Sequence, residues 1–378
     1  MIRVLHVIDH LGLGGAQTAV LDMLRNRDRT AFAVEAAVLH GWGPFADALE
    51  ADGVKVFSLS PAKWPPRYLP NFSQLIAKGN YDVLHFHLQA ANWLMKPLAA
   101  LAGAPVRISH DHTSGDLKFR GVGSLLPDAS AHLFSTRVIA VSEGVRDFLI
   151  RWEAVPSDQV EVIANGVDDT MFRPPSDAER QAARRRLGLP ERAFVAGAMG
   201  RLAHEKNFAI LPELARRHPE VHFVVAGSGS EEANLKSLTA RLGVTERVHF
   251  AGAVTDRTGF YHALDAFLLP SLHEGLPMAL LEAMASGLPI LASRLEGIAA
   301  ALVEDGEGLL AGAGRTDEFS EKLTRLEKDA ALRARLAAAA RAKSASFSAA
   351  RTARRVEAVY YAELGIAPVG GADKYSPR

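Results

Sequence analysis

Two glutamates stand eight residues apart in the segment EGLPMALLE, and this spacing suits a ligand with hydroxyl groups at both ends. If the residues between Glu274 and Glu282 are mostly helical, the two acids lie about 12 Å apart, roughly the reach of a sugar–diphosphate–ribose ligand. The helix start offers backbone N–H groups, at Gly275 and Leu276, that favour a diphosphate. The alternative, a loop acid and a solvated helix residue, fits poorly because the neighbours of Glu282 are apolar.

Two basic side chains, Arg201 and Lys206, follow a predicted strand in the segment GRLAHEKN. A diphosphate needs cations because negative charge grows on its leaving oxygen. A single Arg or Lys is more often a solvated surface charge, but the position after a strand favours a ligand role for both. The sequence contains no Asp-x-Asp pattern, so the usual two-carboxylate metal site is not evident and we expect no metal.

Glycine-rich turns follow two other predicted strands. The first, LGLGGAQT, lacks the third small residue of a dinucleotide fingerprint, and no acid ends the next strand, so a classical NAD site is disfavoured. Gly14 and Gly15 instead allow backbone to approach a phosphate or an acceptor. Gly227, in the turn GSGSE, is a candidate border of the diphosphate, and the alternative is a simple turn.

Histidines occur at two strand ends, in LHFH (His85 and His87) and ISHDHT (His110 and His112). A metal site is possible in principle, but alternate positions share a face only within each strand and no third ligand can be identified. Structural histidines, or histidines that line a cleft, are the favoured interpretation. Ser142, which follows a strand in RVIAVSEGV, is a further candidate for backbone and hydroxyl contacts.

These residues must be positioned by strands that alternate with helices. Continuous apolar runs predict buried strands of parallel sheets covered on both faces. The predicted strands lie at 4–8, 32–39, 54–59, 83–86, 106–109 and 138–141, and then at 194–199, 222–226, 248–250, 266–269 and 290–292. We therefore predict an α/β fold of two Rossmann-like domains that face one another across a deep cleft, the expected ligand position.

The turn Asn165-Gly166 and the pair Pro174-Pro175 mark the predicted domain boundary. We assign 1–170 to the first domain, 171–348 to the second, 349–364 to a final helix and 365–378 to a flexible tail.

Composition narrows the class of protein. The 378 residues include 43 basic and 43 acidic side chains, so the charge balance does not indicate a nucleic-acid partner. The absence of cysteine permits a reducing cytoplasm, and no apolar run approaches the roughly 20 residues that span a bilayer. We expect a cytoplasmic protein with at most peripheral membrane contact.

The segment EGLPMALLEAMASGLPILAS closely resembles the Glu-x7-Glu signature of family 4 glycosyltransferases, which have the GT-B fold. GRLAHEKN is similar to the G-R-x3-E-K-N pattern of that family, and the Asn-Gly-Val-Asp turn from Asn165 is similar to its domain crossover. The resemblance implies a nucleotide-sugar domain after an acceptor-side domain, and a last helix that returns to the first domain.

The resemblance also implies roles for single residues. Glu274 contacts the transferred sugar, Glu282 the ribose, and His110 lies beside the sugar. Val254, after FAGA, contacts the nucleotide base, and the Gly-Gly loop is also typical of the family.

The expected activity is transfer of a hexose-type sugar from a UDP- or GDP-type donor to a hydroxyl group, with retention and without metal or other cofactor. The acceptor is expected to be a glycan, a lipid-linked molecule or a small molecule, in surface polysaccharide, glycolipid or lipid-linked glycan assembly. Two alternatives stay open: a sugar-nucleotide epimerase of similar fold, and a catalytically silent subunit that binds nucleotide sugars.

Overall fold

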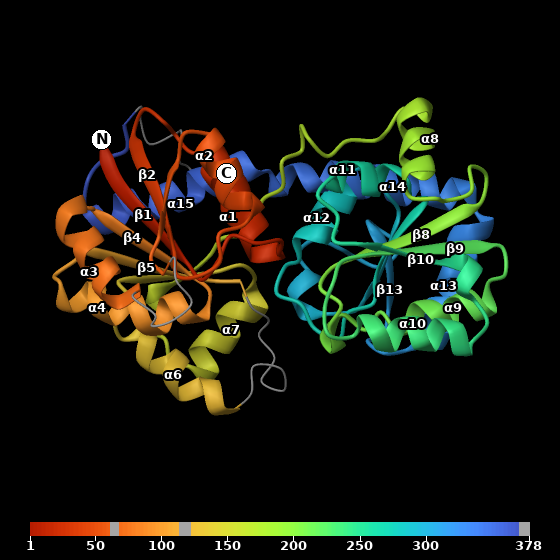
Figure 1. The fold of residues 1–378 in the computed structure, drawn as a ribbon, viewed down its shortest axis with the longest axis horizontal. Helices are drawn as coiled ribbons and strands as arrows, with labels where there is room; N and C mark the ends of the chain where they lie inside the picture. The colour runs from red at the N-terminus through yellow and green to blue at the C-terminus, as the bar shows by residue number, and fades with distance from the viewer. Residues whose placement is uncertain (61–67, 113–121, 370–378) are drawn as a thin grey trace. The chain divides into compact units, whose positions relative to one another are not determined.

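The computed structural model describes residues 1–60, 68–112 and 122–369. Its contacts divide the chain into two compact units (Figure 1). The first unit contains Met1–Gly166 and the segment from Ala349 onward, and the second contains Val167–Ser348. The first change of unit thus follows Gly166, within the predicted boundary segment and four residues before the predicted limit at 170. Residues 370–378 of the predicted tail lie outside the described residues.

The first unit is built on a seven-stranded parallel sheet in the order β3-β2-β1-β4-β5-β6-β7. The strands are β1 (Ile2–Ile8), β2 (Phe32–Val38), β3 (Lys55–Ser58), β4 (Val83–His87), β5 (Val106–Asp111), β6 (Arg137–Ala140) and β7 (Val160–Val162). The strand order changes direction between β1 and β4, and the carboxyl ends beside such a point commonly hold ligands. The short strand β7 was not predicted.

Apolar residues cover both faces of this sheet. Along β1, Val4 and Ile8 belong to one core cluster, and Leu5 and Val7 belong to another. The alternation follows from the two-residue period of a strand and explains why the strands are apolar throughout. The helices are α1 (Gly15–Arg25), α2 (Pro44–Ala51), α3 (Tyr68–Gly79), α4 (Lys96–Leu101), α6 (Val122–His132) and α7 (Glu143–Trp152), with the π-helix η1 (Ala91–Met95) before α4.

The last helix, α15 (Ala349–Leu364), completes the first unit although it comes after the second unit in the sequence. It contacts α1 and β5 (Figure 1). The ring of Phe32 lies 5.8 Å from that of Tyr360 and 5.2 Å from that of Tyr361, so the helix adds aromatic side chains to the core.

The second unit has a six-stranded parallel sheet in the order β10-β9-β8-β11-β12-β13. The strands are β8 (Phe194–Met199), β9 (Val221–Ala226), β10 (Val248–Gly252), β11 (Ala266–Leu269), β12 (Ile290–Ser293) and β13 (Gly308–Ala311). The helices are α8 (Asp177–Arg186), α9 (Ile210–Arg217), α10 (Glu232–Arg241), α11 (Arg257–His262), α12 (Met278–Ala285), α13 (Thr316–Lys328) and α14 (Ala330–Ser344). Two parallel-sheet, Rossmann-like units confirm the predicted fold class.

Candidate functional site

Two residues selected from the sequence meet at strand ends of the second unit. Lys206 Nζ donates a hydrogen bond of 2.6 Å to Oε1 of Glu274. Ser271 Oγ donates a second hydrogen bond, of 2.7 Å, to the same oxygen. The Glu274 side chain is 8% exposed and that of Lys206 is 21% exposed, so the pair is partly shielded from water while it remains reachable. The site therefore presents a fixed carboxylate next to an ammonium group.

Backbone contacts hold the two loops that carry this pair. Lys206 ends the 3-10 turn η3 (His204–Lys206), and the next residue, Asn207, has a left-handed backbone with φ 51°. The Asn207 side chain donates to the carbonyl of Pro270 at 3.2 Å, and the N–H of Leu272 donates to the carbonyl of Glu205 at 2.8 Å. The loop after β8 is thereby fastened to the loop after β11.

Gly297 packs directly against the peptide of Glu274 and was not among the predicted site residues. A Cβ at Gly297 would lie 2.0 Å from the carbonyl oxygen of Glu274 and 2.2 Å from that of Gly275. Such distances cannot be accommodated without a shift of backbone. Only glycine therefore fits against this peptide. The sequence offered one indication of this role, a glycine in the turn after β12.

The start of α12 lies next to Glu274 along the chain. Pro277 is the N-cap and the helix begins at Met278. No side chain of the described residues caps this start. Gly275 and Leu276 are buried just before it. The helix dipole at an end without a side-chain cap favours an anion.

Glu282 is buried within α12, where its side chain is 2% exposed. Tyr261 OH donates to Oε2 at 2.9 Å, and Arg257 Nη1 donates to Oε1. Burial raises the pKa of Glu282, while Arg257 and Tyr261 act in the opposite direction. Glu282 is therefore an oriented, buried acid and not a solvated helix residue.

Arg201 pairs with Glu205 and not with Glu274. Its side chain is 72% exposed and donates to Glu205, four residues along the chain. The structure thus brings Lys206 to Glu274, and places Arg201 in a separate, exposed ion pair.

The loop after β9 contacts the loops after β8 and β10 through Gly227. Gly227 has φ +144°, and a Cβ there would lie 1.8 Å from the carbonyl oxygen of Gly200. The N–H of Gly227 donates to the carbonyl of Gly252 at 2.7 Å, and Val254 follows two residues later, partly buried. Gly227 therefore has a packing role that does not depend on any ligand.

The remaining candidates lie in the first unit. Gly14 is the N-cap of α1, with extended backbone, and a Cβ on Gly15 would meet open space. Ser142 caps α7, since its hydroxyl accepts from the N–H of Val145 at 3.4 Å. His110 is only 3% exposed, whereas His112, one residue past β5, is partly exposed.

Five histidines gather on one face of the first sheet, and two groups of three have ligand atoms within 4.8 Å of one another. The groups are His6, His85 and His87, and His87, His110 and His112. A third ligand could not be identified from local sequence patterns, because these do not specify that β1 and β5 both neighbour β4. Burial lowers the pKa of His85, His87 and His110 well below the usual value, so these rings are neutral.

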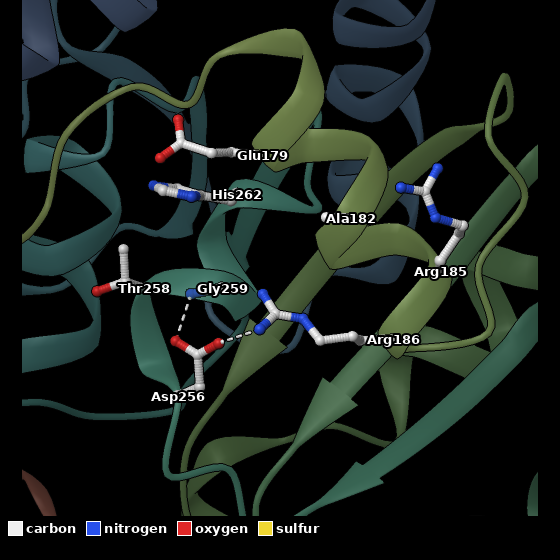
Figure 2. Close-up of a pocket in the computed structure, with 8 residues that line it drawn as sticks. All are labelled: Glu179, Ala182, Arg185, Arg186, Asp256, Thr258, Gly259 and His262. Atoms are coloured by element: carbon white, nitrogen blue, oxygen red, sulfur yellow. Dashed lines mark hydrogen bonds and ion pairs between the residues drawn. The ribbon is translucent and has the colours of Figure 1, made fainter.

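A cavity of about 460 Å³ is lined mainly by residues of α8 and α11. Figure 2 shows the side chains that line it. Asp256 there accepts from the N–H of Gly259 at 3.0 Å and pairs with Arg186 at 3.0 Å. The lining residues are Glu179, Ala182, Arg185, Arg186, Asp256, Thr258, Gly259 and His262. None of them was a predicted site residue, and the charges facing this open hollow largely compensate one another, so we do not assign the site to it.

Comparison with known proteins agrees with this architecture. The family model for glycosyl transferases group 1 matches residues 179–343, and that for glycosyltransferase family 4 matches residues 13–170. D-inositol 3-phosphate glycosyltransferase of Salinispora arenicola is 33% identical over 316 residues, which cover 75% of this chain and 69% of that protein. UDP-Gal:alpha-D-GlcNAc-diphosphoundecaprenol alpha-1,3-galactosyltransferase of Escherichia coli is 29% identical over 308 residues, 77% of this chain and 79% of the other.

Solved structures share the fold. Anabaena HepE in complex with UDP-glucose has a TM-score of 0.87 and 22% identity, over 96% of this chain and 100% of that one. The lipopolysaccharide-biosynthesis glycosyltransferase WaaG has a TM-score of 0.74 and 15% identity, over 96% and 100% of the two chains. The fold and these matches define the chain as a glycosyltransferase of the GT-B class. More particularly, it belongs to glycosyltransferase family 4, also described as group 1.

Proposed function

We propose that the chain transfers a hexose-type sugar from a UDP- or GDP-sugar to an acceptor hydroxyl, with retention at the anomeric carbon. The observation that carries this proposal is the contact between Lys206 and Glu274 beside the start of α12. It puts a cation, a carboxylate and a helix N-terminus within one loop region, which is the set of groups that a sugar diphosphate needs. The E. coli relative named for a UDP-Gal donor and the neighbour solved with UDP-glucose support such a donor.

The donor diphosphate binds, in this proposal, at the start of α12. Lys206 turns from Glu274 to a phosphate oxygen, and the exposed side chain of Arg201 is free to add a second cation once it leaves Glu205. These charges and the helix dipole stabilise the negative charge that develops on the leaving diphosphate.

The two glutamates orient the ends of the donor. Glu274, held by Ser271, accepts hydrogen bonds from hydroxyls of the transferred sugar. Glu282 uses its remaining lone pairs for the ribose hydroxyls, while Arg257 and Tyr261 keep its carboxylate in place. The base lies at Val254, and the backbone of Gly227, Gly275 and Leu276 borders the diphosphate.

In this proposal Gly14 and Gly15 let backbone approach a phosphate or the acceptor. His110 orients the transferred sugar together with Glu274, and Ser142 adds backbone and hydroxyl contacts. Because His110 is buried and Ser142 is engaged as a helix cap, contact through these two depends on local adjustment.

No divalent ion is required at the diphosphate in this mechanism, since Lys206, Arg201 and the helix start supply the positive charge. Turnover after treatment with EDTA should equal turnover before it, and a requirement for added Mg²⁺ or Mn²⁺ would contradict this part of the proposal.

The acceptor belongs, by this proposal, to surface polysaccharide, glycolipid or lipid-linked glycan assembly. Relatives named as a diphosphoundecaprenol galactosyltransferase and as a lipopolysaccharide core glycosyltransferase of Rhizobium meliloti support this setting. No described helix is long and apolar enough to cross a membrane. The cysteine-free sequence supports a cytoplasmic location, with at most peripheral contact with a membrane.

The proposal is tested by measuring release of UDP or GDP from a panel of sugar nucleotides, with and without lipid-diphosphate, glycan and small polyol acceptors. Release that depends on an acceptor supports the transferase, and the product's anomeric configuration decides retention. Conversion without an acceptor would instead establish an epimerase, and tight donor binding without turnover under every acceptor would establish a silent subunit.

A further inference from the structure

The last helix of the chain carries a phenol group into the core of the first unit. Tyr360 of α15 is 3% exposed, and its hydroxyl oxygen lies 2.6 Å from His85 Nδ1 and 3.4 Å from His6 Nε2. A phenol has one proton, so it donates only one of these hydrogen bonds. The hydroxyl is the donor in the shorter contact, because O–H donors make shorter hydrogen bonds than N–H donors. Tyr360 therefore donates to His85 and accepts from the Nε2–H of His6.

Burial keeps the side chains of this region uncharged. It raises the pKa of Tyr360 well above its usual value, and it lowers the pKa of His6 to about 3 and that of His112 to about 4. The pKa of His87 is likewise well below its usual value. A neutral imidazole has one N–H and one lone pair, so the hydrogen bond at one ring nitrogen decides the state of the other.

A series of ring contacts leads from His6 to the end of β5. His6 Nδ1 lies 3.0 Å from His87 Nε2, and His87 Nδ1 lies 3.2 Å from His112 Nε2. Since His6 has its proton on Nε2, its Nδ1 accepts from His87, and Nδ1 of His87 in turn accepts from His112. The proton of His112 is thereby placed on Nε2, and its Nδ1 keeps a lone pair.

The Nδ1 atom of His112 is buried and has no hydrogen-bond partner among the described residues. Buried polar atoms of this kind usually meet water, an ion or a ligand. The Asn165 amide also acts on the ring, but an amide can donate or accept and so does not select a tautomer. Of the rings in this series only that of His112 lies past the end of its strand, where it is partly exposed and stacks on His110 at 4.2 Å. Its free lone pair is therefore at the edge of the sheet where ligands are expected.

We propose that Nδ1 of His112 accepts a hydrogen bond from a sugar or polyol hydroxyl of the substrate, in a tautomer that Tyr360 selects through the ring series. This inference rests on the proposed function, since the hydroxyl belongs to the transferred sugar or to the acceptor. His112 is then a substrate contact and Tyr360 a positioning residue, and the role proposed above for His110 is unchanged. A fixed lone pair at this place favours a substrate with a hydroxyl over an analogue that lacks it.

The tautomer is measured by NMR on the ligand-free full chain with ¹⁵N-labelled histidine. The spectra separate rings protonated at Nε2 from rings protonated at Nδ1, and His112→Gln identifies the signal of His112 among the 14 histidines. We expect the proton of His112 on Nε2 alone. In Tyr360→Phe both tautomers of His112 should appear, because the ring series has lost the group that gives it a direction.

Tyr81→Phe is the matched control for the phenol, with folding of all variants checked by circular dichroism. It removes a phenol–carboxylate hydrogen bond to Glu35, also in the first unit, and should leave His112 in a single tautomer. A proton on Nδ1 of His112 in the wild-type chain would overturn the proposal. A single Nε2 tautomer that persists in Tyr360→Phe would overturn the role of Tyr360.

Calorimetry and kinetics test the contact with the hydroxyl. If the hydroxyl belongs to the transferred sugar, His112→Gln should weaken binding of UDP-glucose or GDP-mannose about tenfold and leave binding of UDP or GDP alone unchanged. If it belongs to the acceptor, the KM of the acceptor should rise about tenfold at unchanged donor affinity. His112→Asn, whose side-chain oxygen takes the place of Nδ1, should restore most of either loss.

His222→Gln is the control for histidine replacement, because His222 pairs with His249 at 3.1 Å in the second unit and should affect neither quantity. Donor affinity and acceptor KM in His112→Gln equal to those of this control would overturn the proposal. If no sugar nucleotide binds to the wild-type chain, the proposed function fails, and the tautomer of His112 in the ligand-free chain still decides the inference. If transfer is established but His112→Gln behaves as wild type, only the inference fails.

Discussion

Lys206 Nζ lies 2.6 Å from Glu274 Oε1, although 68 residues separate the two in the chain. The two opposite charges neutralise one another, and Ser271 donates a further hydrogen bond to the same carboxylate oxygen. In the proposed mechanism a diphosphate oxygen replaces Glu274 as the partner of Lys206, and only a local turn of the lysine side chain is needed because its ammonium group is already held next to Glu274. This arrangement reduces the reorganisation needed at the moment of reaction.

Replacement of Lys206 by alanine should lower kcat by about 10²–10³-fold, the usual effect of removing one group that stabilises developing charge. Steady-state release of UDP or GDP provides the measurement. Lys236→Ala is the matched control, because Lys236 also pairs with a glutamate at 2.6 Å in the second unit but lies exposed on α10. Turnover in Lys206→Ala equal to that of the control would remove Lys206 from the mechanism.

Ser271→Ala should reduce kcat by about tenfold while it changes the free energy of unfolding by only about 1 kcal/mol, the usual net value of one hydrogen bond. The reason is that Glu274, the proposed contact of the transferred sugar, loses the hydrogen bond that fixes its carboxylate. Ser344→Ala removes a comparably buried hydroxyl, which donates to Arg341 at 2.7 Å in α14, and should leave kcat unchanged. Equal kcat in both variants would show that the Ser271 bond only contributes stability.

Gly297→Ala should displace the peptide that carries Glu274 and Gly275, since the new Cβ would overlap their carbonyl oxygens. We expect a loss of at least about tenfold in kcat/KM, because small displacements of positioning groups are costly. Gly306→Ala is a suitable control, as its Cβ would meet other atoms no closer than 3.4 Å. Wild-type kcat/KM in Gly297→Ala would mean that the loop tolerates the shift.

Tyr261→Phe should raise the KM for the donor several-fold, since Glu282, the proposed contact of the ribose, loses the hydrogen bond at Oε2 that orients its carboxylate. The stability cost should be about 1 kcal/mol. Tyr81→Phe removes a matched phenol–carboxylate bond, to Glu35 at 2.5 Å in the first unit, and should leave the donor KM unchanged. The prediction fails if calorimetric donor affinity is the same in both variants.

Lys96 provides a pH-dependent prediction. Its side chain is buried and Nζ donates to Ser135 Oγ at 2.8 Å, and burial lowers the pKa of Lys96 from 10.5 to about 7. Between pH 7 and pH 10.5 the unfolded chain holds a proton on Lys96 that the folded chain does not. The free energy of unfolding is therefore not reduced by Lys96 above pH 10.5, and it falls as the pH is lowered toward 7. The charged groups that act on it are Glu153, Asp111, Asp128 and Arg107.

Lys96→Met should therefore raise the free energy of unfolding relative to wild type more at pH 6.5 than at pH 9, by about 1–3 kcal/mol. Chemical denaturation at both pH values gives this difference. Lys236→Met, at an exposed position, should show no such difference. A Lys96→Met curve parallel to wild type across this range would contradict a neutral, buried lysine.

Much of the fold could be predicted because buried parallel strands leave continuous apolar runs. Strand β7 was missed because it has only three residues, and no strand was predicted at the position of β13. Lys206 could be linked to Glu274 only through strand order, which local patterns do not specify. Gly297 escaped notice because its role is a close approach between segments, and its sequence signal is one glycine among 31. The role of Ser142 as the N-cap of α7 could not be predicted, because the residue at which that helix begins was not known from the sequence.

The return of α15 to the first sheet has a consequence for synthesis of the chain. Residues 1–166 emerge from the ribosome first, yet the aromatic side chains of Tyr360 and Tyr361 that pack on Phe32 arrive almost two hundred residues later. Translation at about 5–20 residues per second leaves this hydrophobic surface uncovered for roughly ten seconds or more. The second unit, continuous in sequence, has all of its strands by then, so the later-made half is able to reach its native structure before the earlier-made half.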